Sequence, residues 1–248
     1  MKNVLKTGML PWFALICGEL GLALRIWLYA GVDQKGLLPA GHIASVLAYV
    51  LTALVFAGLF LCVRLPRPLE QYPRLLPAAI ARMIGCAAGV IGVLSVAIFQ
   101  YNSADVLSLL CLVLGVLAAA GLVWTAVCRQ KNSPLTFWGH LAITVFLIFY
   151  TVGRCRLWGA EPQVQEYIFP LLACVFLMLT GYYRAVSDTG MDSGRGLVFF
   201  NQAAVYCCCL SLIGENRLFY MGMILWLVLD LCPEEQIKIP TAPSAEEE

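Results

Sequence analysis

The chain has 248 residues, of which 61% are hydrophobic and 12% are charged, and its formal net charge is +1. Soluble domains carry about 25% charged residues, so this composition excludes an ordinary soluble fold and indicates that most of the chain lies in lipid. A net charge this close to zero also lacks the basic surface that nucleic-acid binding requires. The partner that composition predicts is the lipid bilayer.

Eight apolar segments follow one another along the chain, most of them long enough to cross a bilayer as a helix. They cover residues 9–30, 38–63, 75–99, 106–128, 135–153, 164–183, 197–213 and 218–232. The last two are short, and discounting one of them leaves seven spans. We therefore predict an all-α polytopic membrane protein, a bundle of eight or seven transmembrane helices within residues 1–233. Residues 234–248 are polar and end in three glutamates, which predicts a short, acidic, disordered cytoplasmic tail.

The charges in the loops predict the orientation of the bundle. If the N-terminus is inside, the outer loops and helix ends hold Lys35, Arg154, Arg156 and Arg217, and most other lysines and arginines are cytoplasmic. This asymmetry agrees with the positive-inside rule. We expect a multi-pass protein of the cell membrane with both termini in the cytoplasm.

The first segment carries two charges, Glu19 near its middle and Arg25 toward its outer end. A charged side chain at the centre of a span costs roughly 2.5–3.5 kcal/mol on insertion scales and usually faces the bundle interior. We expect Glu19 to face inward, with Arg82 of the third segment as the best-placed partner. Three interpretations stay open: an ion pair that fixes helix packing, a proton or ion site, and a neutral Glu19 in apolar surroundings.

A short sequence echo links the first and fifth segments. Arg25-Ile26-Trp27 and Arg156-Leu157-Trp158 are each followed by a proline at the same spacing. The echo favours two parallel four-helix repeats, residues 9–128 and 135–232, although a match this short also arises by chance. The two arginines either snorkel beside interfacial tryptophans or flank an outer mouth that holds a phosphate or carboxylate.

Polar residues also lie toward the cytoplasmic side of the last two segments. Asn201, Gln202 and Tyr206 belong to the seventh segment, and Asp230 belongs to the eighth. Asn and Gln within spans more often bind neighbouring helices than ligands. Asp230, Gln202 and Tyr206 are the only candidate group, and a weak one, for a membrane-embedded enzyme that acts on lipid.

Eleven cysteines and two histidines form no recognisable metal or redox motif. No Cys-x-x-Cys pair occurs, and cysteines inside apolar segments usually behave as small apolar residues. His42 and His140 belong to opposite ends of the predicted bundle. The chain also lacks a P-loop and the usual serine and zinc hydrolase motifs. We expect no metal and no cofactor, and these absences speak against an enzyme without excluding one.

Small residues recur at four-residue spacing in the third and fourth segments. Gly85 and Gly89 are one such pair, and Gly115 lies one turn before an alanine run that ends at Gly121. Small residues at this spacing let helix backbones approach closely. We therefore expect the third and fourth helices to be central.

The intramembrane charges and the echo favour a small transporter or permease-like protein, with an anionic solute suggested by the arginines. The candidate binding residues are Glu19, Arg82, Arg25, Arg156, Gln202 and Asn201. Two alternatives remain. One is a non-catalytic structural or regulatory subunit that binds a membrane protein partner or a second copy. The other is an enzyme acting at a lipid headgroup.

Overall fold

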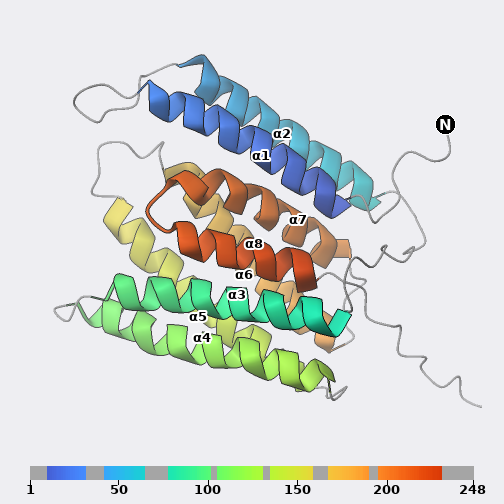
Figure 1. The fold of residues 1–248 in the computed structure, drawn as a ribbon, viewed down its shortest axis with the longest axis vertical. Coiled ribbons are helices and arrows are strands. Elements are labelled where there is room, and N and C mark those ends of the chain that lie inside the picture. Colours follow the sequence, from blue (N-terminus) through green and yellow to red (C-terminus); the bar gives the residue numbers. More distant parts are fainter. Residues whose placement is uncertain are drawn as a thin grey trace, which may run out of the picture.

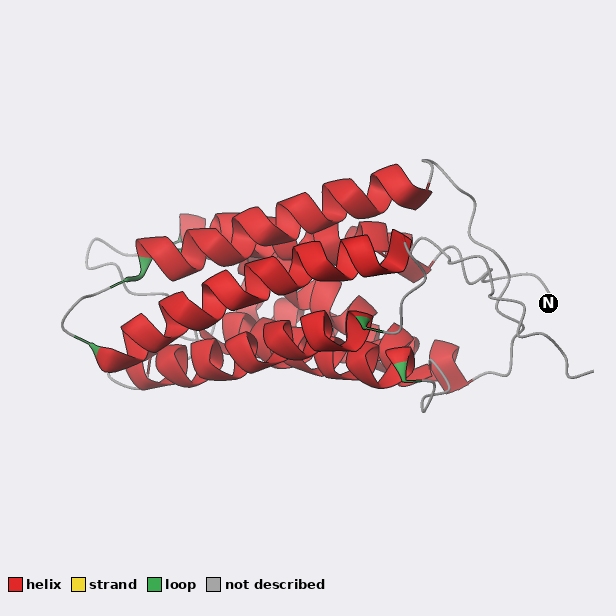
Figure 2. Ribbon diagram, turned by 90° about the horizontal axis from the view of Figure 1, so that it is seen from below, coloured by secondary structure: helices red, strands yellow, loops and turns green. Residues whose placement is uncertain are grey.

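A computed structural model describes residues 10–31, 42–64, 78–101, 105–130, 135–158, 167–189 and 195–230, and the predicted acidic tail lies outside these ranges. Within them every regular element is a helix. The helices are α1 (Leu10–Ala30), α2 (Ile43–Arg64), α3 (Ala78–Phe99), α4 (Val106–Gln130), α5 (Thr136–Trp158), α6 (Ile168–Asp188), α7 (Arg195–Leu210), the short 3-10 helix η3 (Ser211–Ile213) and α8 (Arg217–Asp230). They run side by side along one axis (Figures 1 and 2).

Seven of the described helices are long and apolar enough to cross a membrane, and α8 is a shorter apolar helix. The seventh predicted segment qualifies because η3 extends α7, so the spanning stretch runs from Gly196 to Ile213. The protein is therefore an all-α polytopic membrane protein, as the sequence predicts. The short helix is α8 alone, whose 14 residues rise about 21 Å.

The helices α3 to α8 pack as a closed ring. Each packs against the next along the chain, and α8 packs against α3 in the most extensive contact of the molecule. The hairpin of α1 and α2 lies outside this ring and packs against α7, as Figure 1 shows at the top. We call the end of the ring near Arg154 of α5 the Arg154 end, and the opposite end, near His140 of α5, the His140 end.

The central helix is α7, which corrects the expectation that the third and fourth helices are central. Every residue from 201 to 210 is buried. Buried residues make up 61% of the span Gly196–Ile213, against 28% of Val106–Arg129 in α4. The cause is the position of α7, which belongs to the ring and also packs against the outer hairpin of α1 and α2. Its polar residues are consequently interior ones.

The small residues of α3 do mark a close helix contact, and their partner is α8. A Cβ atom added to Gly92 would lie 3.0 Å from the carbonyl oxygen of Phe219. One added to Gly222 would overlap the carbonyl oxygen of Ala88. Backbones this close leave no room for a side chain. The glycines therefore allow the short helix α8 to close the ring against α3.

Aromatic residues fill the middle of the ring between its two polar ends. Tyr150 stacks on Phe146 of the same helix, with ring centroids 5.8 Å apart, and its ring lies 5.3 Å from that of Phe219. All three side chains are buried. Side chains of α5 and α8 thus meet in the interior, as the offset and tilted packing of aromatic rings favours.

Candidate functional site

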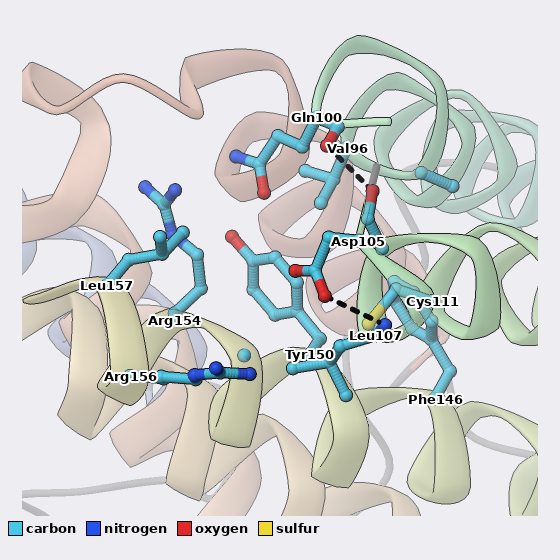
Figure 3. Close-up of a pocket in the computed structure, with 13 residues that line it drawn as sticks. Val96, Gln100, Asp105, Leu107, Cys111, Phe146, Tyr150, Arg154, Arg156 and Leu157 are labelled. Atoms are coloured by element: carbon cyan, nitrogen blue, oxygen red, sulfur yellow. Dashed lines mark hydrogen bonds between the residues drawn. The ribbon is translucent and has the colours of Figure 1, made fainter. Parts of the chain in front are cut away.

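The larger of two cavities at the Arg154 end lies between α3, α4 and α5. It holds about 490 Å³ of space. Its polar lining consists of Gln100, Asp105, Ser108, Tyr150, Arg154 and Arg156. Figure 3 shows the two arginines entering from α5, opposite Gln100 and Asp105. Pockets for small molecules are commonly about 300–1,000 Å³, so this cavity has the size of a ligand site.

Arg154 is a nearly buried cation that lines this cavity. The sequence places it beyond the fifth span, but α5 continues to Trp158 and the Arg154 side chain points inward, 10% exposed. Its guanidinium donates a hydrogen bond to Oε2 of Glu215, at 3.0 Å. Glu215 is 75% exposed, so this ion pair joins a buried cation to a carboxylate at the surface. A residue expected in a loop is thus part of the interior.

A chain of hydrogen bonds ties the turn before α8 to the cavity wall. The Gln100 amide donates to Oδ1 of Asn216 at 2.6 Å, and Nδ2 of Asn216 donates to the Tyr150 hydroxyl at 3.0 Å. Asp105 Oδ1 accepts from the backbone N–H of Leu107 at 3.2 Å and so caps the start of α4. These contacts hold the polar lining in place.

A second, smaller cavity lies on the other side of Arg154. It holds about 60 Å³ and is lined by Arg25 and Tyr220 as well as by Arg154 itself. A cavity needs about 10–15 Å³ of such space for one water, so this one admits a small anion or a few waters. The buried Tyr220 hydroxyl makes no hydrogen bond of ordinary geometry with a described residue. Arg154 therefore lines both cavities.

Arg25 is an interior residue that binds the end of α7. It is 3% exposed, and Nη1 donates to the carbonyl oxygen of Leu210 at 2.7 Å. Nη2 donates to the Tyr29 hydroxyl at 3.2 Å, and the guanidinium lies 5.3 Å from the centre of the Phe169 ring. A cation at the C-terminus of a helix stabilises the carbonyls left unpaired there. Arg25 thus lies within the bundle, and snorkelling to the interface does not describe it.

The Arg154 end carries an interior positive charge. Arg25 and Arg154 are buried, Arg156 is exposed at the larger cavity, and the carboxylates of Asp105 and Glu215 are both exposed. A guanidinium is always charged and presents a planar fork of donors that matches a carboxylate or a phosphate. The arrangement can therefore bind an anion that enters the cavities.

A second polar cluster lies at the His140 end, and it joins five helices. Arg129 Nη2 lies 3.2 Å from His140 Nε2 and 3.8 Å from an oxygen of Asp188, while the nearest oxygen of Asp188 is 3.5 Å from His140 Nε2. Arg184 donates to Oδ1 of Asn201 at 2.9 Å. These side chains come from α4, α5, α6 and α7.

The fifth helix of this cluster is α8, through Trp226. The Arg184 guanidinium lies 4.4 Å from the centre of the Trp226 ring, which is a cation–π contact. His140, Arg184 and Asn201 are each at most 3% exposed. The cluster therefore ties the helices together from inside.

The sequence-predicted residues lie in different parts of the bundle. At the Arg154 end, Arg156 lines the larger cavity and Arg25 the smaller one, whereas Asn201 lies at the opposite end. Gln202 is fully buried, and neither polar atom of its amide has a hydrogen-bond partner among the described residues. The remaining two residues, Glu19 and Arg82, do not reach either site.

The expectation that Glu19 faces inward is wrong. Glu19 lies on the exposed side of α1, Arg82 is half-buried on α3, and the described residues include no ion pair between them. The physical reason is topology: α1 packs on α7 and α2, and α3 packs on α4 and α8, so the two helices are not neighbours in the packing. Similar depth in the bilayer does not place two helices side by side.

The residues of the lipid-enzyme alternative lie in different surroundings. The Tyr206 hydroxyl is 2.9 Å from Oγ1 of Thr52, and both residues are buried. Gln202 is buried in the same helix, whereas Asp230 ends α8. The described residues also contain no group of three or more His, Cys, Asp or Glu side chains that would hold a metal.

Sequence reasoning placed Arg154 on the outer side but not inside a helix. It missed the roles of Gln100, Asn216 and Tyr150 at one end and of His140, Arg184 and Asp188 at the other. The available signal was the length of α5 and α6, which run on to Trp158 and Asp188 and so carry Arg154 and Arg184 inside helices. The apolar runs end just before these arginines, so the predicted spans ended there too.

Comparison with protein-family models, with curated proteins and with solved structures finds no match to this chain, so its function has to be inferred from the geometry of these sites.

Proposed function

We propose that the protein is a small membrane transporter that binds an anionic solute at the Arg154 end. The observation that carries the proposal is the position of Arg154, whose buried guanidinium lines both cavities. A buried cation is costly in an apolar medium and is usually kept for a ligand or a partner. A solute with a carboxylate or phosphate group fits the donors that Arg154 and Arg156 present.

The size of the larger cavity supports a small organic or inorganic anion. About 490 Å³ accommodates a molecule of up to roughly two dozen heavy atoms at typical pocket occupancy. The smaller cavity, at about 60 Å³, admits only a small ion or one charged group of such a molecule. The anionic group would lie at Arg154, with the rest of the solute in the larger cavity.

The interior of the ring favours transport with a conformational change over an open pore. Polar clusters lie at both ends, and Phe146, Tyr150 and Phe219 pack against one another between them. A solute bound at the Arg154 end would have to displace this packing to reach the His140 end. Transporters bind at one side of such a barrier and then rearrange. From the loop charges we expect the Arg154 end to face outward.

The test is saturable stabilisation by an anion that depends on Arg154. The purified protein is heated with chloride, phosphate, acetate or succinate at matched ionic strength, and unfolding is followed by tryptophan fluorescence. Because a ligand that binds only the folded state raises its stability, at least one anion should raise Tm with saturation. Arg154→Gln should weaken the apparent affinity at least tenfold, since it removes a charge-assisted hydrogen bond.

Arg217 supplies the matched control, because it is an exposed arginine at the start of α8 near the same end of the bundle. Arg217→Gln should bind the same anion as the unmodified protein does. Uptake of the labelled anion into liposomes then tests transport itself. The proposal fails if no anion stabilises with saturation, if Arg154→Gln binds normally, or if a bound anion is never carried across.

A further inference from the structure

Glu19 is a carboxylate exposed in the middle of a membrane span. It lies ten residues into the 21-residue helix α1, within the span Trp12–Ala30, and its side chain is exposed. It forms no ion pair or hydrogen bond with a described residue. Charged residues at this depth almost always face the bundle interior, a water-filled cavity or an oppositely charged partner. The position therefore requires an explanation.

The packing of α1 fixes this orientation. A Cβ atom added to Gly18 would lie 2.7 Å from the Cβ of Cys209, and one added to Gly21 would lie 2.6 Å from Leu210. Arg25, on the same side of α1, binds the Leu210 carbonyl. Rotating the helix to bring Glu19 inward would break the Arg25 hydrogen bond and bring larger side chains against α7. Glu19 is consequently held on the outer face.

Glu19 lies at the centre of a regular exposed stripe. Trp12, Ile16, Glu19, Ala23 and Ile26 follow one another at spacings of four, three, four and three residues, and all five are exposed. This is the spacing of the positions that meet a second helix in a left-handed helix pair. A single polar residue among apolar ones in such a seam commonly fixes the register of the partner.

We propose that this stripe is the docking surface for a transmembrane helix of another protein that carries a lysine or arginine at the middle of the bilayer. The basic residue would donate a hydrogen bond to the Glu19 carboxylate and neutralise it. The apolar positions would pack against the partner, with Ala23 allowing close approach. In peptide systems such a hydrogen bond between helices in lipid strengthens association by about tenfold.

Charge makes a second copy of this chain a less suitable occupant than a helix with a central lysine or arginine. The other exposed charged residues in the described part of the chain are Asp105, Arg156, Glu215 and Arg217. All four lie near the Arg154 end, and Arg82, at a depth similar to that of Glu19, is half-buried on α3. A twofold pair of α1 helices would instead bring two carboxylates together, because such an interface is made of the same surface twice.

The experiment uses the full-length protein in lipid vesicles with a synthetic polyleucine helix as the probe. The peptide carries one central lysine, and a matched peptide carries leucine there. Energy transfer between a dye on the protein and a dye on the peptide measures association. The lysine peptide should bind about tenfold more tightly than the leucine peptide, and Glu19→Leu should remove that preference.

Two variants sharpen the result. Glu19→Lys should reverse the preference toward a peptide with a central glutamate, whereas Ile91→Ala, on the exposed side of α3, should change nothing. Equal binding of the lysine peptide to the unmodified protein and to Glu19→Leu would overturn the proposal. Self-association of two differently labelled copies that is lost in Glu19→Leu would also overturn it, because the surface would then join copies of this chain.

Discussion

The two ends of the helix ring use similar polar residues in opposite ways. At the Arg154 end the polar side chains line two cavities, and the acidic partner of Arg154 is Glu215 at the surface. At the His140 end, Arg184 contacts Asn201 and Trp226, and all three are buried. One end places its polar groups where a solute can reach them, and the other uses them to join helices.

This difference indicates that intramembrane arginines have two distinct roles in one bundle. Arg154 can exchange a contact with Glu215 for a contact with an anion, because the carboxylate is exposed and can be solvated. Arg184 has no such freedom, because its buried contacts have to be kept for the cation to remain in the interior. The first is suited to binding and the second to stability.

The largest effect should come from removing Arg184. Arg184→Leu deletes a charge-assisted hydrogen bond and a cation–π contact, and it leaves the Asn201 amide buried without that partner. We expect a loss of about 3 kcal/mol in the free energy of unfolding. Unfolding by dodecyl sulfate in mixed micelles measures it. Arg217→Leu, at an exposed position, should change stability by less than about 0.5 kcal/mol, and equal losses would contradict the comparison.

A matched pair of asparagine variants tests the two ends directly. Asn201→Ala should cost about 2 kcal/mol, because it withdraws a hydrogen bond from the buried Arg184. Asn216→Ala should cost about 1 kcal/mol, because water entering the larger cavity can replace its bonds to Gln100 and Tyr150. The same unfolding assay measures both. A greater loss for Asn216→Ala would show that the Arg154 end is the one that holds the ring closed.

The fold class follows from sequence because apolar length alone predicts a membrane helix. The ends of the helices were harder to predict, since the apolar runs end at Arg154 and Arg184 whereas the helices continue beyond them. A helix satisfies its backbone hydrogen bonds within itself, so it can continue past a charged residue whose side chain points into the bundle. The sequence predicted that the last helix is short. The glycine spacing of the third segment predicted a close helix contact, but it did not indicate that α8 is the partner.

The candidate site was only partly predictable. Arg25 and Arg156 could be proposed because charge within or beside a span is rare. The pairing of Glu19 with Arg82 could not be judged, since it depends on which helices are neighbours, and the chain order does not state that α1 packs on α7. His140 gave no signal at all, because its partners Arg129 and Asp188 lie on two other helices.

The smallest effect, and the one that locates the anion, is expected for Tyr220→Phe. The Tyr220 hydroxyl is buried at the smaller cavity without an ordinary hydrogen bond to a described residue, so its removal should change the free energy of unfolding by less than about 0.5 kcal/mol. If the anionic group enters that cavity, the hydroxyl donates to it, and the variant should bind the anion about threefold more weakly. Tyr182→Phe, at an exposed position of α6, is the control. Unchanged affinity in Tyr220→Phe together with weakened affinity in Arg154→Gln would confine the anion to the larger cavity, where Arg154 and Arg156 alone supply the charge.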